Sequence, residues 1–257
     1  MNFNQNGGNW LEQIPPVTRN LIIINILIWV VEFAAPGFGR KIVSYGGLHY
    51  VESSIFNRLQ PFTYMFIHDP RNIMHVAFNM FTLWMFGRVL EQVWGSKRYL
   101  FFYLVCGIGA AFIQECVWAL TWEHDYISDI AKQNGFTYTH MQDIVAEARI
   151  SGDSQIFEAM AQYKSFLVTV GASGAIFGLL LGFAFVFPDL PMYIMFIPVP
   201  VKAKYMVAGY AVIEFFLGVG GRVDTVAHFA HLGGMIFGLL ILLYWKKKGT
   251  LHGNRYY

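Results

Sequence analysis

The chain has 257 residues, of which 56% are hydrophobic, 18% aromatic and only 13% charged, and its net charge is +2 at pH 7. Soluble globular domains carry about 25% charged residues, so this chain has too little polar surface to stay in water. The small net charge gives no reason to expect a nucleic acid as a partner. The composition predicts an integral membrane protein.

Six apolar segments are candidates for membrane spans, each of which needs about 20 residues of helix. They cover residues 17–35, 73–93, 99–120, 166–187, 203–220 and 223–245. The polar, Asn/Gly-rich start of the chain lacks the basic region of a signal peptide, so we expect the first segment to be retained as a span. We therefore predict an all-α membrane protein with six transmembrane helices in a single domain.

Two long loops are expected on the same side of the membrane. Residues 36–72 join the first two spans, and their run 62–66 is apolar enough to lie along the membrane interface. His68, beside Asp69 in this loop, is expected to be solvated. A polar insert at residues 123–164 enlarges the connection between the third and fourth spans, and residues 143–163 have the composition of a short helix pair outside the membrane.

The distribution of lysine and arginine predicts the orientation. With the N-terminus inside, the inner segments hold ten of these residues and the outer segments hold eight. Short loops count most in this rule, and the basic loops 94–98, 188–204 and 246–248 all favour the inner side. Both termini are therefore expected in the cytoplasm, with the two long loops outside.

Polar side chains inside spans are costly and mark candidate functional sites. The set comprises His75, Asn79, Glu115, Ser173, Glu214, His228 and His231. Ser173 and His231 lie seven and eight residues from the outer ends of their predicted spans, about 10–12 Å deep at 1.5 Å per residue. Asn79 follows His75 by four residues, so both project from one helix face near the outer end of the second span. These four side chains predict one site in the outer half of the membrane.

Ser173 and His231 each stand beside glycines spaced four residues apart. The glycines are Gly174, Gly178 and Gly182 after the serine, and Gly234 and Gly238 after the histidine. Taken alone, either stripe is typical of close helix packing in membranes. Taken together, two closely packed helices would bring a nucleophile within hydrogen-bond reach of a base, which favours catalysis.

In these motifs the chain resembles the rhomboid intramembrane serine proteases over nearly its whole length. Gly171-x-Ser173-Gly174 resembles the family's nucleophile motif, and Ala230-His231-x-x-Gly234-x-x-x-Gly238 resembles its catalytic-histidine helix. His75-x-x-x-Asn79 resembles the second-span motif, and residues 91–96 and 198–204 are also similar to bacterial rhomboids.

The resemblance implies a Ser–His dyad in which Ser173 attacks the peptide carbonyl and His231 acts first as base and then as acid. The oxyanion would be held by the backbone N–H of Ser173 and the side chains of His75 and Asn79. Gly171, Gly174 and Gly234 would pack the active site. The substrates would be transmembrane segments of other proteins, cut near the outer face of a bacterial plasma (inner) membrane, with small residues before the scissile bond. No metal or cofactor is called for, and the other partner is membrane lipid.

Three features near the predicted dyad need separate interpretation. Phe177 stands where many bacterial rhomboids carry a tyrosine; it keeps a face for stacking on His231 and lacks the hydroxyl, so we expect tuning and not inactivity. His228, one turn before His231, is expected to be a structural or water-facing neighbour. Glu115 and Glu214 lie in other helices, so no carboxylate is predicted as a third catalytic member.

Other functions fit the sequence less well. A zinc protease would need a His-Glu-x-x-His helix, and the sequence contains no His-Glu pair. An aspartyl protease would need two aspartates in span cores, which hold none. Ligation of haem by His75 with His231 or His228 would leave Ser173 and Asn79 unexplained, and a secondary transporter would show an internal repeat. A rhomboid-like pseudoprotease that binds membrane segments without cutting them remains the alternative.

Overall fold

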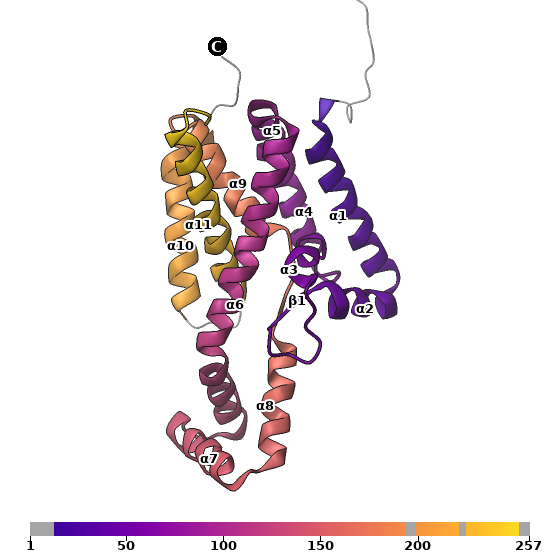
Figure 1. Cartoon of the computed structure of the whole chain (residues 1–257), viewed down its shortest axis with the longest axis vertical. Coiled ribbons are helices and arrows are strands. Elements are labelled where there is room, and N and C mark those ends of the chain that lie inside the picture. Colours follow the sequence, from indigo (N-terminus) through magenta and orange to yellow (C-terminus); the bar gives the residue numbers. More distant parts are fainter. Residues whose placement is uncertain (1–12, 194–198, 221–224, 252–257) are drawn as a thin grey trace, which may run out of the picture.

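The computed structural model describes residues 13–193, 199–220 and 225–251, apart from the side chains of residues 225–227. These residues form a bundle of helices with a smaller helical lobe at one end (Figure 1). Residues 1–12 of the polar start and residues 223–224 of the sixth predicted span lie outside the described residues. The prediction of a mostly helical chain with helices apolar enough for a membrane is confirmed.

Helices lie at all six predicted span positions. In chain order they are α1 (Pro16–Ala34), the run of α4, η3 and α5 (Ile73–Thr82, Leu83–Gly87 and Arg88–Trp94), α6 (Ser96–Asn134), α9 (Ser173–Val186), α10 (Ala203–Val219) and α11 (Thr225–Lys247). Of the described helices, four are both long and apolar enough to cross a bilayer: α1, Ile73–Trp94, α6 and His228–Lys247. With 14 and 17 residues, α9 and α10 cover about 21 and 25 Å, less than the hydrocarbon thickness of about 30 Å.

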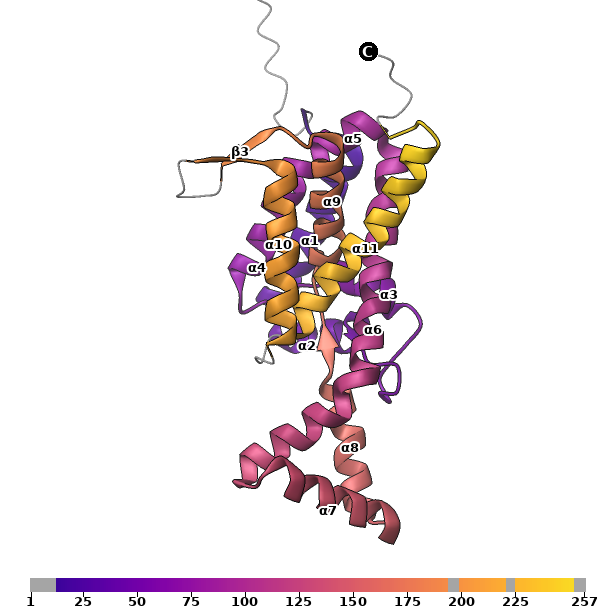
Figure 2. The ribbon, with the colours of Figure 1, turned by 90° about the vertical axis from the view of Figure 1, so that its left-hand side faces the viewer.

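The two long loops are folded. Residues 36–72 contain α2 (Pro36–Gly46), β1 (Leu48–His49), α3 (Gln60–Thr63) and the 3₁₀ turn η2 (Tyr64–Phe66). In the insert, the last part of α6 leaves the bundle and lies beside α7 (Tyr138–Ser151) and α8 (Ser154–Phe166), as Figures 1 and 2 show. A separate apolar cluster holds these three helices together: Tyr126, Ile127, Ala131, Met141, Val145 and Met160. The expected helix pair corresponds to α7 and α8, and α6 adds a third helix that the sequence did not predict.

For the fourth predicted span, residues 166–187, the predicted start of the helix is wrong. The chain leaves α8 at Phe166 and forms strand β2 (Val168–Thr169), and α9 begins only at Ser173. β2 pairs antiparallel with β1, as its β-branched residues favour. Gly171 has φ +127°, a conformation that other residues rarely adopt, and it ends the extended segment. Ser173 therefore stands at the first residue of a helix, not two turns inside one.

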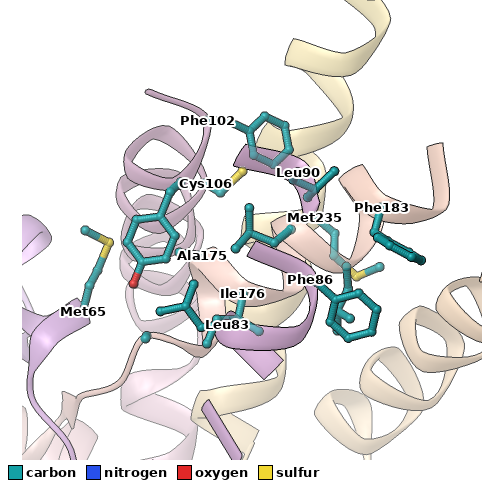
Figure 3. Packing of buried hydrophobic residues seen from close by; sticks show 14 of the residues in the cluster. Met65, Leu83, Phe86, Leu90, Phe102, Cys106, Ala175, Ile176, Phe183 and Met235 are labelled. Carbon is teal, nitrogen blue, oxygen red and sulfur yellow. The ribbon is translucent and has the colours of Figure 1, made fainter. Parts of the chain in front are cut away.

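The main core surrounds α9. Figure 3 shows side chains from η2, η3, α5, α6, α9 and α11 meeting there; they include Met65, Leu83, Phe86, Leu90, Phe102, Cys106, Ala175, Ile176, Phe183 and Met235. Packing is so close that a Cβ on Gly178 would lie 2.5 Å from the Sγ of Cys106. The hairpin of β3 (Pro191–Tyr193) and β4 (Pro200–Lys202) then leads from α9 to α10.

A buried carboxylate ties α1 to the bundle. Glu91 in α5 is 2% exposed, and its oxygens accept hydrogen bonds from the backbone N–H groups of Val17 (3.0 Å) and Thr18 (2.7 Å). The hydroxyls of Thr18 (2.8 Å) and Ser96 (2.6 Å) also donate to it. The first N–H groups of a helix lack intrahelical partners and carry partial positive charge, so Glu91 serves as the N-terminal cap of α1.

Replacing Glu91 by alanine is expected to lower the free energy of unfolding by about 3 kcal/mol, because it leaves two backbone N–H groups and two hydroxyls without their charged acceptor. Glu91→Gln keeps the shape and one acceptor oxygen, so its loss should be smaller. Thermal unfolding in detergent, followed by tryptophan fluorescence, measures both. An unchanged midpoint for Glu91→Ala would contradict the capping role.

Candidate active site

Ser173 and His231 meet between α9 and α11. The Oγ of Ser173 lies 2.8 Å from the Nε2 of His231, although the two residues are 58 positions apart. Glycines permit this approach: a Cβ on Gly234 would collide with the backbone carbonyl of Gly174. The two residues predicted as nucleophile and base are thus within hydrogen-bond distance, on two helices whose backbones touch.

Phe177, one turn after Ser173 in α9, holds the imidazole of His231 in plane. Its ring stacks on the histidine ring with centroids 4.2 Å apart and an interplanar angle of 5°. Stacking restricts rotation of the imidazole about its last torsion, so Nε2 stays directed at the Ser173 hydroxyl. The expected stacking contact is present without a tyrosine hydroxyl.

A carboxylate does reach the histidine, which corrects the sequence-based expectation. The Oε2 of Glu214, in α10, lies 3.0 Å from the Nδ1 of His231 and 2.6 Å from the Nδ1 of His228. An ionised carboxylate can only accept, so it places a proton on Nδ1 of His231. The Nε2 of the neutral ring is then free to accept a hydrogen bond from the Ser173 hydroxyl.

The sequence contained a signal for Glu214 that the prediction did not use. Glu214 lies six residues from the outer end of the fifth predicted span, about 9 Å deep at 1.5 Å per residue. That depth matches the one that associated Ser173 with His231. The prediction excludes this carboxylate because it lies in another helix, yet three neighbouring helices can each contribute one side chain at a single depth.

His75 lies beside Ser173, across Gly171. A Cβ built on Gly171 would stand 2.8 Å from the Nε2 of His75 and 3.7 Å from the Oγ of Ser173. Asn79, one turn further along α4, is 6% exposed, and its Nδ2 has no hydrogen-bond partner among the described residues. A buried N–H group without an acceptor is costly, and a ligand oxygen at this site would supply one.

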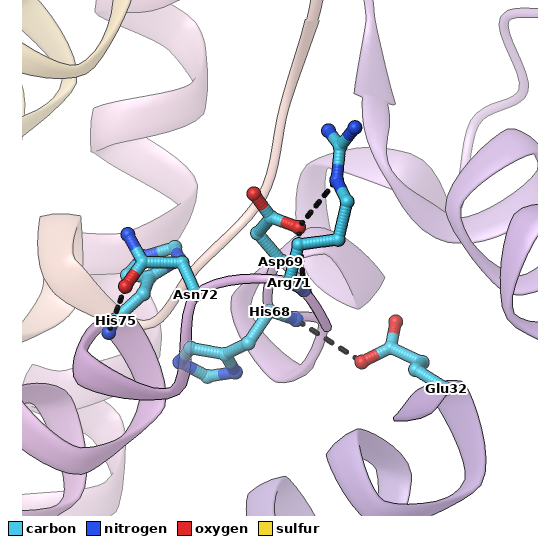
Figure 4. A network of polar contacts seen from close by, with 6 residues as sticks. All are labelled: Glu32, His68, Asp69, Arg71, Asn72 and His75. Atoms are coloured by element: carbon cyan, nitrogen blue, oxygen red, sulfur yellow. Dashed lines mark hydrogen bonds and ion pairs between the residues drawn. The ribbon is translucent and has the colours of Figure 1, made fainter. Parts of the chain in front are cut away.

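The loop before α4 positions His75 (Figure 4). Asn72 caps the helix, and its Oδ1 accepts a hydrogen bond from the backbone N–H of His75 (3.2 Å). The ring of His68 packs edge-on against that of His75, with centroids 5.0 Å apart. The backbone N–H of His68 donates to the Oε2 of Glu32 in α1 (3.3 Å), while Asp69 forms an ion pair with Arg71.

The expectation that His68 is solvated is wrong. Its side chain is fully buried, and this burial lowers the pKa of His68 to about 3, so the ring is neutral at pH 7. A neutral His68 packs against His75 and adds no charge beside it. The neighbouring Asp69 misled the prediction because its carboxylate turns away to Arg71.

The Rhomboid domain profile matches residues 57–122 and 143–248, together about two thirds of the chain. The chain belongs to the rhomboid family. The unmatched residues 123–142 include the end of α6 and the turn into α7, so this rhomboid departs from the family profile in its smaller helical lobe. The motif around Pro198 lies partly outside the described residues, whereas the predicted site residues from His75 to His231 all fall within the matched segments.

Two curated relatives are similar at modest identity. The chain is 26% identical over 216 residues to Rhomboid protein 1, mitochondrial, of Saccharomyces cerevisiae, covering 78% of this chain and 61% of that protein. It is 25% identical over 238 residues to Rhomboid protease AarA of Providencia stuartii, covering 88% of this chain and 70% of that protein. The match thus spans less than two thirds of the yeast protein's length.

Proposed function

We propose that this rhomboid is an intramembrane serine endopeptidase that cuts transmembrane segments of other membrane proteins. The observation that carries the proposal is the 2.8 Å contact between Ser173 Oγ and His231 Nε2. A serine hydroxyl is a weak nucleophile until a base can take its proton, and among the described residues no other hydroxyl forms a hydrogen bond with a histidine ring nitrogen. The relative named a rhomboid protease supports the same activity.

The proposed reaction assigns a role in the chemistry to each side chain of the site. Ser173 attacks the peptide carbonyl while His231 accepts its proton, and Glu214 stabilises the imidazolium through Nδ1. The oxyanion receives hydrogen bonds from Asn79, His75 and the N–H of Ser173, which at the start of α9 is not needed within the helix. His231 then returns the proton to the departing amine, and water completes hydrolysis of the acyl-enzyme in the same way.

We place the site near the outer face of a bacterial plasma membrane, with both termini cytoplasmic. The positive residues of the short loops support this orientation. Ser173 lies at the end of α9 nearer the insert, whereas the beginning of α1 and the end of α11 lie at the opposite end of the bundle (Figure 1). Because cleavage requires an extended peptide, substrate helices weakened by Gly or Pro should be preferred.

Labelling with a serine-directed fluorophosphonate tests this function. Wild type and His228→Ala should be labelled, and Ser173→Ala and His231→Ala should not. Equal labelling of wild type and Ser173→Ala would overturn the assignment of the nucleophile. Absence of labelling in a folded wild-type protein would favour the alternative, a rhomboid-like protein that binds membrane segments without cutting them.

Replacing Asn79 by alanine is expected to lower kcat by about 10²–10³-fold with little change in KM, because a donor to the oxyanion acts mainly in the transition state. Asn79 makes no side-chain donor contact that the change would break, so the unfolding temperature should stay close to that of wild type. Steady-state cleavage of a fluorogenic transmembrane peptide gives both constants. A rise in KM at constant kcat would assign Asn79 to substrate binding instead.

A further inference from the structure

Three side chains behind the histidine base converge on one point. Among the described residues, Glu214, His228 and His231 form the group whose ligand atoms, one from each residue, all lie within 4.8 Å of one another. His228 and His231 are three residues apart, on one face of α11, and Glu214 faces them from α10. The side chains are 14–20% exposed, so they are sheltered from lipid and solvent without being sealed off.

We propose that this cluster is an inhibitory binding site for Zn²⁺. Two imidazole nitrogens and one carboxylate are ligands that zinc accepts, at about 2.0–2.2 Å each, with a fourth position left for water. The carboxylate oxygen stands 2.6 Å from one Nδ1 and 3.0 Å from the other. These separations are somewhat shorter than the edge of a zinc tetrahedron, so small side-chain rotations would open the space for the ion. Both donor helices are packed elements, which favours a preformed site.

Zinc at this position prevents His231 from acting as a base, because it changes which ring nitrogen carries the proton. Without metal, Glu214 keeps the proton of His231 on Nδ1, and Nε2 accepts the proton of Ser173. A metal on Nδ1 requires the neutral ring to carry its proton on Nε2 instead. No proton is gained or lost in this exchange, but Nε2–H can then only donate to the serine oxygen. His231 cannot take the Ser173 proton until zinc leaves.

Binding is measured first, independently of activity. Tag-free Ser173→Ala protein in detergent, titrated with ZnCl₂ by calorimetry, should bind one ion per chain. Adding His228→Ala should weaken binding by more than about 100-fold, since even a group that only orients a ligand is worth about 10–100-fold. Adding His124→Ala, an exposed histidine in α6 paired with Asp125, is the matched control and should leave the affinity unchanged. Equal affinity with and without His228, or no stoichiometric binding, would overturn the site.

Inhibition rests on the proposed function and is measured separately. Zinc should abolish fluorophosphonate labelling of the wild-type protein, and a chelator should restore it. His228→Ala should keep its own metal-free level of labelling at the same zinc concentration. If zinc binds as expected while no metal-free variant is labelled, the proposed function fails and the metal site stands. Labelling that persists in zinc-saturated wild type would overturn the inhibition.

Discussion

Replacing Ser173 or His231 by alanine is expected to reduce cleavage of a transmembrane substrate by about 10⁵–10⁶-fold, which places it below detection in most assays. In the proposed reaction, each change removes a group that forms or breaks a bond. The two losses should not add in the double variant, because the serine and its base act as one unit. Initial rates in proteoliposomes at saturating substrate measure the effect. Cleavage by Ser173→Ala above that of protein-free liposomes would contradict it.

The same assay separates a dyad from a triad. Glu214→Gln should lower kcat by about 10³–10⁴-fold, because an amide can donate to Nδ1 of His231 and so favour the wrong tautomer. Glu115→Gln is the matched control: this carboxylate, in α6, accepts a hydrogen bond from the backbone N–H of Val51 (2.9 Å), outside the Ser173–His231–Glu214 contacts. Its activity should stay within a few-fold of wild type. Wild-type activity of Glu214→Gln would leave Ser173 and His231 acting as a dyad alone.

Most of the bundle could be predicted because membrane helices consist of long apolar runs. Backbone groups in lipid must be satisfied within the segment, so hydropathy located a helix at each of the six positions. The glycine stripes predicted the contact between α9 and α11, since these helices can touch only where side chains are absent. That contact in turn predicted that Ser173 and His231 lie close together.

The errors share a different cause, which is that contacts between segments override local pattern. Residues 167–172 are apolar enough to continue a helix, but pairing of β2 with β1 holds them extended. The local sequence of His68 predicts a solvated side chain. Its contacts with α1 and α4 bury it, and no local pattern indicates this burial. Glu214 looked isolated in its own helix, and its partners lie one helix further along the chain.

Replacing Gly234 by alanine is expected to separate α9 from α11, the helices that carry the proposed nucleophile and base. The new methyl group would occupy the position of the Gly174 carbonyl, and backbone cannot yield as a flexible side chain can. Overpacking of this kind costs about 1–3 kcal/mol or more, and a shift of about 1 Å between reacting groups can cost about 10²-fold in rate. We therefore expect a lower unfolding temperature together with a loss of at least this size in kcat.

Gly209→Ala is the matched control for that substitution. Gly209 lies inside α10, and a Cβ built there meets nothing within 4 Å. Alanine is the better helix former by about 0.5–1 kcal/mol, so this variant should unfold at the same temperature as wild type or higher and keep full activity. Both variants change one glycine to alanine within a helix, but only in Gly234→Ala does the new methyl group meet the backbone of a neighbouring helix. If Gly234→Ala behaved like Gly209→Ala, α9 and α11 could not be in backbone contact, and the 2.8 Å approach of Ser173 to His231 would need another explanation.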